Sequence, residues 1–205
     1  VGSERHSIVM RSMSGHYFVG PDNGLYTLVA DQDGVDEVRI IDESKQRLKG
    51  SADSYTFHGR DLYVYVGARL ASGQLKFEDS GESAGQKLTK IPYQKAVAEK
   101  GELRGVIPVL DPQYGNVWSN IPRELVQKTF ANAKQLNVVI RNNGKTVYTK
   151  TLPITDTFSG VPTGKPLLYF NSLSNLSLAL NQGDFAKANK IGSGPEWTMA
   201  ITAEK

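Results

Sequence analysis

The stretch Asn137-Val-Val-Ile-Arg-Asn-Asn-Gly-Lys-Thr-Val-Tyr-Thr-Lys150 decides the fold of the second half of the chain. Two runs rich in β-branched residues flank the dipeptide Asn143-Gly144, which favours a tight turn because both residue types tolerate positive φ. The stretch therefore predicts an antiparallel hairpin. Further short strand-like runs occur at 105–110, 166–170 and 197–202. Closely spaced strands with turn residues between them predict a small antiparallel β-barrel or sandwich.

The first half of the chain combines strand and helix patterns. Alternating apolar runs predict strands at 7–11, 17–20 and 38–41. Residues 25–30 fit a helix or a short strand equally well. Leu62, Val66 and Leu70 fall on one helical face, so a helix is expected there. Asp61 stands near its start, where a carboxylate helps to cap free N–H groups.

A change in composition divides the chain. Residues 72–92 are rich in Gly, Ser, Lys and Glu, which predicts a tether between two domains. We therefore expect one domain over 1–92, including the tether, and a β-rich domain over 93–205. The second domain should contain one helix within 120–135 and a short one within 181–188.

Composition and charge exclude several classes of protein. The chain has 205 residues, 39% of them hydrophobic, and no apolar run approaches the roughly 20 residues of a spanning helix. Its net charge of +3 comes from interspersed signs, so we expect neither a nucleic-acid nor a membrane partner. Cysteine is absent, which removes disulfides, thiolate metal sites and cysteine nucleophiles, and no other metal-ligand spacing occurs.

The start of the chain carries two further expectations. No signal peptide is visible, and we expect a cytoplasmic protein. The chain opens on Val1-Gly-Ser without an initiator Met, so we expect it to be a fragment whose upstream segment carries part of the site.

The run Tyr55-Thr-Phe-His-Gly-Arg-Asp61 carries His58, one of only three histidines. Gly59 would let a substrate approach the backbone closely. A turn from strand to helix also exposes N–H groups that hold an anion or a polarised water. His58 is therefore a candidate for activating water, with Arg5 as its partner. The alternative is a structural histidine and an ordinary surface arginine.

The run Asp111-Pro-Gln-Tyr-Gly-Asn-Val-Trp118 places four kinds of binding group within eight residues. The Asn116 amide both donates and accepts, as an adenine edge requires. The rings of Tyr114 and Trp118 can form walls for a flat base or a cation, and Asp111 can pair with an ammonium group. The alternative is the end of a strand that buries its Trp.

The run Asn171–Gly183 is polar at both ends and apolar between them. Ser172 can bond a ligand carboxylate or amine, whereas the alternative is a hairpin with capped ends. The earlier run Pro21-Asp-Asn-Gly24 either binds a ligand through its backbone or forms only a tight turn.

Taken together, these runs resemble the S-adenosyl-L-methionine hydroxide adenosyltransferase family, which also contains fluorinase and chlorinase enzymes. The resemblance covers the whole chain in order. It rests on Val1–Arg5, Phe18–Leu25, Phe57–Asp61, Asp111–Ile121 and Asn171–Ser172.

The resemblance implies an α/β N-terminal domain, of which this chain holds only the C-terminal part, followed by the small β-barrel or sandwich. It implies homotrimers that bind substrate between the N-terminal domain of one subunit and the C-terminal domain of the next. Arg5 and His58 would be two members of an Asp-Arg-His triad that activates water. The triad Asp and the ribose-binding Asp would lie upstream of Val1.

The resemblance also implies how S-adenosylmethionine is held, as substrate and without a further cofactor. Asp111 and Ser172 would hold its methionine part, and Trp118 would line that pocket. The adenine-binding set would consist of Asn116, which reads the base, Tyr114 and Phe158, which flank it, and backbone groups near Gln182. Gly59 would line the site beside His58.

The reaction implied is hydrolysis of S-adenosylmethionine to adenosine and methionine, without a metal. Family halogenases carry Tyr in place of His58, and fluorinase carries Ser in place of Gly59, which favours hydrolysis. The alternatives are a halogenase, an adenosyl-ligand-binding module without catalysis, and a β-rich interaction domain.

Overall fold

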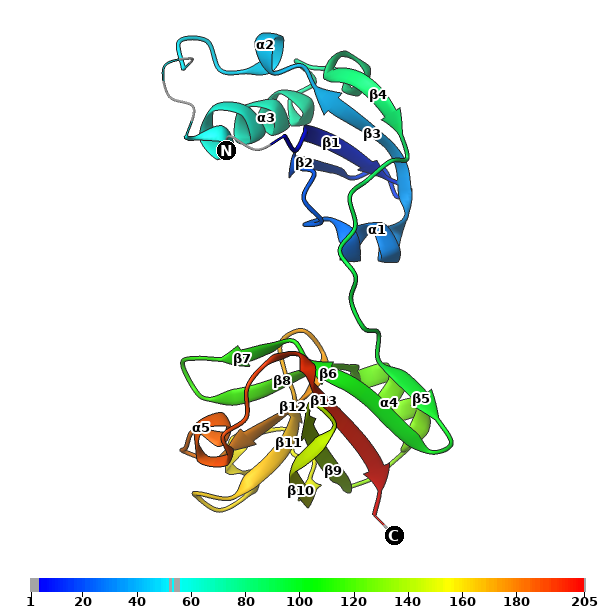
Figure 1. Ribbon diagram of the computed structural model, residues 1–205, viewed down its shortest axis with the longest axis vertical. Coiled ribbons are helices and arrows are strands. Elements are labelled where there is room, and N and C mark those ends of the chain that lie inside the picture. The colour runs from blue at the N-terminus through cyan, green and yellow to red at the C-terminus, as the bar shows by residue number, and fades with distance from the viewer. Residues whose placement is uncertain (1–3, 52, 54–55, 205) are drawn as a thin grey trace. The chain divides into compact units, whose positions relative to one another are not determined.

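The computed structural model of the protein describes residues 4–51, 53 and 56–204. The chain divides into two compact units, Val1–Pro92 and Tyr93–Lys205, here unit 1 and unit 2 (Figure 1). Hydrophobic clusters lie within each unit, so the fold of each follows from its own sequence.

Unit 1 contains one antiparallel sheet with the strand order β2-β1-β3-β4. Its strands are β1 (Ser7–Ser12), β2 (Tyr17–Pro21), β3 (Val35–Ile41) and β4 (Gly81–Gly85). The strands predicted at 7–11, 17–20 and 38–41 are confirmed. The α/β character expected of the N-terminal domain stays a prediction.

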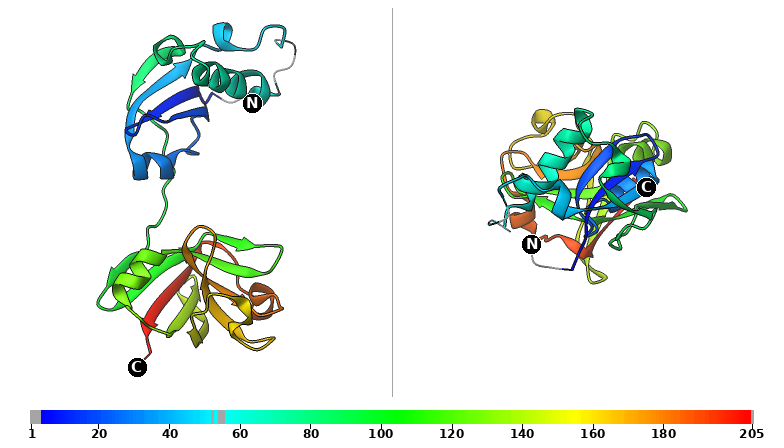
Figure 2. Two further views of the ribbon diagram at one scale, coloured as in Figure 1. Left: turned by 180° about the vertical axis from the view of Figure 1, so that it is seen from behind. Right: turned by 90° about the horizontal axis from the view of Figure 1, so that it is seen from above.

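Helices lie against the two faces of this sheet (Figures 1 and 2). Side chains alternate along β1, so Val9 joins the cluster formed with α3 (Tyr65–Ala71), whereas Ile8 and Met10 join that formed with α1 (Thr27–Asp33). Residues 25–30 thus lead into a helix rather than a strand.

The helix expected around Leu62–Leu70 begins differently from the prediction. A wide π-helical turn, Gly59–Val64, precedes α3, and no side chain caps it. The expected capping role of Asp61 is wrong, because the buried Asp61 carboxylate accepts hydrogen bonds from Arg60 at 2.5 and 2.9 Å instead. An adjacent guanidinium outcompetes backbone N–H groups for a carboxylate through its charge and its two parallel donors.

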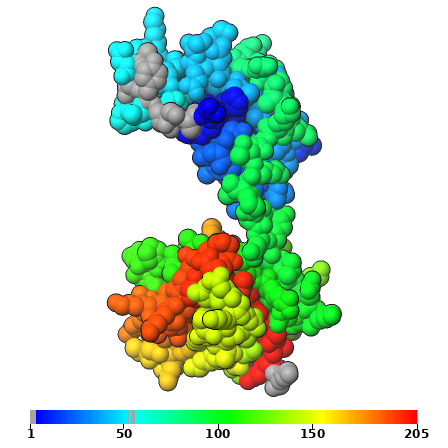
Figure 3. Space-filling model, in the orientation of Figure 1, coloured from blue at the N-terminus to red at the C-terminus, as the bar shows by residue number. Residues whose placement is uncertain are grey.

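The expected tether over 72–92 is wrong for its first half. The 3₁₀ turn Phe77–Asp79 buries Phe77, and β4 pairs with β3. Glycine is required in β4, because a Cβ at Gly81 would approach the Ile40 carbonyl oxygen to 1.8 Å. The Gly- and Ser-rich composition therefore reflects close strand packing there. Residues 89–95 are exposed along their whole length (Figure 3).

Unit 2 contains two antiparallel sheets. The five-stranded sheet has the order β10-β9-β13-β6-β5, from β5 (Val97–Glu99), β6 (Glu102–Ile107), β9 (Gln135–Asn142), β10 (Lys145–Pro153) and β13 (Gly194–Ala203). The four-stranded sheet has the order β11-β12-β8-β7, from β7 (Val109–Asp111), β8 (Asn116–Pro122), β11 (Pro166–Phe170) and β12 (Asn175–Leu180).

The predicted hairpin is confirmed. Asn142 pairs with Lys145, and φ is 47° at Asn143 and 78° at Gly144, as the sequence of the turn requires. The helix expected within 120–135 is α4 (Arg123–Thr129), and the short one is α5 (Phe185–Asn189).

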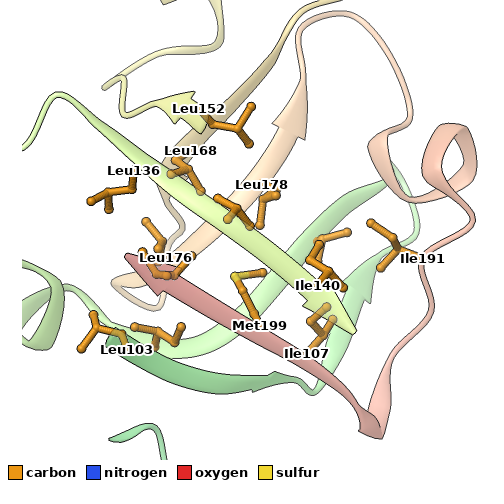
Figure 4. Packing of buried hydrophobic residues seen from close by; sticks show 14 of the residues in the cluster. Leu103, Ile107, Leu136, Ile140, Leu152, Leu168, Leu176, Leu178, Ile191 and Met199 are labelled. Atoms are coloured by element: carbon orange, nitrogen blue, oxygen red, sulfur yellow. The ribbon is translucent and has the colours of Figure 1, made fainter. Parts of the chain in front are cut away.

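Both sheets of unit 2 pack on one hydrophobic core (Figure 4). The five-stranded sheet contributes Ile140 and Met199, and the four-stranded sheet contributes Leu168 and Leu178, all fully buried. Burial of each such side chain stabilises the fold by about 1.5–3 kcal/mol. The antiparallel, β-rich character is confirmed, whereas the described residues form two sheets and no closed barrel.

Candidate functional site

A pocket of about 580 Å³ lies in unit 2, where the β7–β8 hairpin meets the segment between β12 and α5. The lining residues are Gln113, Tyr114, Asn116, Phe158 and Leu180–Asp184. The structure thus brings together candidates from three distant parts of the sequence, namely Tyr114 and Asn116, Phe158, and Gln182.

The hairpin places the polar groups of this pocket. Asp111 pairs with Asn116 across it, and the buried Asn116 amide donates to the Asp111 carboxylate at 3.4 Å. Gly115 has φ +67°, and a Cβ there would approach Asp184 to 2.1 Å. Its carbonyl also accepts from Ala186 N–H at 2.9 Å. The hairpin tip is therefore fixed against the start of α5.

A row of aromatic side chains leads from the pocket across the sheet. Phe158 stands in the 3₁₀ turn Phe158–Gly160, and its ring centroid lies 5.1 Å from that of Tyr169. The indole N–H of Trp118 donates to the Tyr169 hydroxyl at 3.2 Å. Tyr114 and Phe158 expose 61% and 44% of their surface, which leaves ring faces free for a ligand.

Tyr169 is the member of this row that the sequence argument missed. It pairs with Ser177, which pairs with Trp118, so the three side chains lie side by side on neighbouring strands. Burial raises the pKa of Tyr169, and the Trp118 hydrogen bond offsets this only in part. Tyr169 is therefore a neutral acceptor at neutral pH. Its position between two apolar residues of a predicted strand was the available signal.

Ser172 does not line this pocket. It is exposed in the turn between β11 and β12, whereas the pocket lies at the Leu180 end of β12, roughly 17 Å along the strand. Asn171 holds the turn, because its Oδ1 accepts from Leu173 N–H at 2.9 Å and Asn175 N–H at 3.1 Å. Asn171 Nδ2 is buried and has no hydrogen-bond partner among the described residues.

In unit 1, His58 lies in a cluster of charged groups. Its Nε2 is 3.1 Å from Arg47 Nη2 and 3.4 Å from Glu43 Oε2. Glu43 begins α2 (Glu43–Gln46), Arg47 directly follows that helix, and the two side chains form an ion pair at 3.2 Å. The half-buried Arg5 precedes β1, whose first residue Ser7 donates to Glu43 Oε1 at 2.6 Å.

Glu43 is held in its ionised form. Burial raises its pKa, but hydrogen bonds from Ser7 and Arg47 and the charges of His58 and Arg47 outweigh burial, so the pKa is lowered. Gly59 has open space beside it, because a Cβ there would meet no heavy atom of the described residues within 4 Å. The cluster therefore presents an imidazole, a guanidinium and a carboxylate beside an unobstructed backbone.

Within the described ranges, no group of three or more His, Asp or Glu side chains is arranged to hold a metal ion. Among the same residues, no helix has the length and apolarity to cross a membrane.

Sequence models of both domains of one enzyme family match this chain. The N-terminal domain of SAM hydroxide adenosyltransferase matches residues 1–81, and its C-terminal domain matches residues 105–198. The chain belongs to the SAM (S-adenosyl-L-methionine) hydroxide adenosyltransferase family.

The individual relatives include both S-adenosyl-L-methionine hydrolases and fluorinases. The (R)-S-adenosyl-L-methionine hydrolase of Methanocaldococcus jannaschii is 54% identical over 70 residues, 34% of this chain and 25% of the relative. The fluorinase of Actinopolyspora mzabensis is 28% identical over 192 residues, 90% of this chain. The chain spans 60% of that fluorinase's length.

A solved structure has the same fold. A crystal structure of an uncharacterized conserved protein from Thermotoga maritima superposes with a TM-score of 0.83 at 32% identity. The match covers 98% of this chain and 73% of the other.

Proposed function

We propose that the protein hydrolyses S-adenosylmethionine to adenosine and L-methionine by attack of water on the ribose C5′. The observation that carries the substrate is the unit 2 pocket, which the Asn116 amide lines together with the exposed aromatic residues Tyr114 and Phe158. A relative named as an (R)-S-adenosyl-L-methionine hydrolase and the two domain matches support the same substrate.

Unit 2 supplies the groups that bind the substrate. Tyr114 and Phe158 stack on the two faces of adenine, and Asn116 pairs with its edge, with the Gln182 backbone beside it. Asp111 pairs with the ammonium group of the methionine part, and Trp118 lies along its chain. An indole face also attracts the positive sulfonium.

Unit 1 supplies the groups that activate water. The C5′–O bond forms as the C5′–S bond breaks, and the bonding electrons leave with sulfur as a neutral thioether. No acid is therefore needed at the leaving group. His58 takes the proton of the attacking water, and the Arg5 guanidinium stabilises the developing hydroxide.

His58 also favours water over halide as the nucleophile. A base that removes a proton serves the attack of water, whereas a halide ion has no proton to lose. Because both bond changes occur without a Lewis acid in this scheme, we propose a reaction independent of metal and cofactor. A cytoplasmic homotrimer stays a prediction from the family resemblance.

The proposal is tested by incubating the full chain with S-adenosylmethionine and separating the products by chromatography. Adenosine and methionine should form in equal amounts, and EDTA should leave the rate unchanged. Chloride and fluoride should yield no 5′-halo-5′-deoxyadenosine. Formation of that product would favour the halogenase alternative, which the similarity to a fluorinase also suggests. Tight binding without turnover would indicate a binding module instead.

Asn116→Ala should weaken adenosine binding by about 10- to 100-fold, the scale of one bidentate contact to a base. The reason is that Ala removes both the donor and the acceptor facing the base while the aromatic walls remain. Calorimetric titration with adenosine measures the effect. Asn137→Ala, on β9 and outside the pocket, is the matched control and should bind as the parent does. Equal dissociation constants for the two variants would place adenine elsewhere.

A further inference from the structure

We infer that the run Pro21–Gly24, together with Thr27, anchors the connecting segment, residues 86–95, to unit 1. This segment leads from the last strand of unit 1 to unit 2, and, described along its whole length, it forms neither helix nor strand. The sequence leaves two alternatives for the run 21–24, a loop that binds a ligand and a simple tight turn. Its contacts in the structure indicate a third role, which is independent of the proposed reaction.

Two backbone N–H groups of the connecting segment donate to side chains that are distant in the sequence. The Thr89 N–H donates to Asp22 Oδ1 at 2.8 Å, and the Ile91 N–H donates to Thr27 Oγ1 at 3.0 Å. The partners are 67 and 64 residues apart. Backbone groups of an exposed irregular segment usually bond to water, so two such bonds fix the course of this segment over unit 1.

The turn and the start of α1 prepare the acceptor for Ile91. Thr27 is buried, and its hydroxyl donates to the Gly24 carbonyl at 2.7 Å. A hydroxyl has one hydrogen and two lone pairs, so donation to Gly24 leaves the lone pairs for the Ile91 N–H. Gly24 has φ +90°, and a Cβ there would approach Ile91 Cγ2 to 2.4 Å. Glycine at this position therefore leaves the space that the Ile91 side chain occupies.

The other contacts of the segment are weaker or less specific. The Asp22 backbone is itself held, because its N–H donates to the His6 carbonyl at 2.9 Å. Leu88 packs against the hydrophobic cluster formed with α1. Lys90 and Asp31 form an ion pair at 2.9 Å, but their side chains are 49% and 25% exposed, and such surface pairs contribute little. The hydrogen bonds to Asp22 and Thr27 are therefore the principal anchor.

The anchor shortens the connection between the two units. On the unit 2 side, Asn120 Nδ2 donates to the Gln94 carbonyl at 2.6 Å, and both residues belong to unit 2. Only Pro92 and Tyr93 separate Ile91, held by unit 1, from Gln94, held by unit 2. A Gly- and Ser-rich composition is typical of a long flexible tether, whereas the two anchors reduce the connection to these two residues.

Exchange of single amide hydrogens with water, followed by NMR spectroscopy of the full chain, tests the inference. The Lys90 N–H lies between the two anchored amides and has no acceptor among the described residues, so it serves as an internal reference. After correction for intrinsic sequence effects, Thr89 and Ile91 should exchange about 10-fold more slowly than Lys90, the scale of one hydrogen bond. Equal rates at the three amides of the parent would overturn the inference.

Variants of the two acceptors identify the anchor. Asp22→Ala should raise the exchange rate of the Thr89 amide to that of Lys90, and Thr27→Val should do the same for the Ile91 amide. Asp22→Asn keeps an oxygen acceptor and should keep the Thr89 amide slow. The amide signals of β1 and β3 confirm that each variant is folded. Parental exchange rates in folded Asp22→Ala and Thr27→Val would show that the run 21–24 and Thr27 do not hold the segment.

Asp31→Ala is the control for the ion pair, because it removes the partner of Lys90 and leaves both hydrogen bonds in place. It should exchange Thr89 and Ile91 as slowly as the parent does. Faster exchange there than in Asp22→Ala would assign the attachment to the ion pair and contradict the inference. Trypsin gives a second measurement, since a protease cleaves a segment that has left its anchor. Cleavage after Lys90 should be faster in Asp22→Ala than in Asp22→Asn, and equal rates would count against the anchor.

Discussion

His58→Ala is expected to slow hydrolysis of S-adenosylmethionine by about 10²-fold or more, the scale of lost acid–base catalysis. Water must then attack C5′ without transferring its proton to a positioned base. KM should stay close to the parental value, because the groups proposed to hold adenine and the methionine part belong to unit 2. The rate of adenosine formation at saturating substrate measures the effect.

His16→Ala is the matched control for that experiment. His16 is exposed between β1 and β2 and bonds Ser14, away from the charged cluster. It should hydrolyse substrate at the parental rate. An unchanged rate in His58→Ala would remove His58 from the mechanism, whatever the outcome for His16.

Phe185→Ala is expected to lower the free energy of unfolding of unit 2 by about 3–5 kcal/mol, the range for Phe truncation in a core. Phe185 is fully buried, and its ring lies edge-on to Tyr148 at 5.2 Å. Phe185 is also the first residue of α5. The N–H of the next residue, Ala186, donates to the Gly115 carbonyl at the tip of the β7–β8 hairpin. Loss of the ring should therefore loosen the pocket as well as the core.

Urea unfolding followed by tryptophan fluorescence measures this change selectively, because both tryptophans, Trp118 and Trp197, belong to unit 2. Phe57→Ala provides the control, since Phe57 is 53% exposed and belongs to unit 1. It should leave the fluorescence midpoint unchanged. A shift of less than about 1 kcal/mol in Phe185→Ala would mean that the core closes over the missing ring.

The strands of this fold could be predicted where the side chains carry the signal. β9 and β10 flank an Asn-Gly turn, and this hairpin was predictable from local chemistry except for the register shift between Thr146 and Tyr148. β4 could not be predicted, because its Gly- and Ser-rich sequence has no apolar alternation. Its position comes from backbone pairing with β3 and from close packing at Gly81, which are tertiary effects.

The candidate site likewise contains contacts that could be predicted from the sequence and contacts that could not. Asp111 and Asn116 share one short run, so their proximity could be predicted from a hairpin. Glu43 and Arg47 could not be linked to His58 in advance. The described residues between Arg47 and His58 form no strand that fixes a spacing. Only the folded unit brings Glu43, Arg47 and His58 within 3.5 Å of one another. Contacts across irregular segments leave no periodic signal in a sequence.

The wide turn Gly59–Val64 separates the direction of residue 58 from the packing of the helix that follows it. An α-helix turns each successive residue by about 100°, so one additional residue in a turn rotates everything before it relative to everything after it. Leu62 and Val66 can therefore keep their register against the sheet while the direction of residue 58 is set separately. The turn therefore allows the direction of residue 58, the proposed base, to change without repacking of α3 on the sheet.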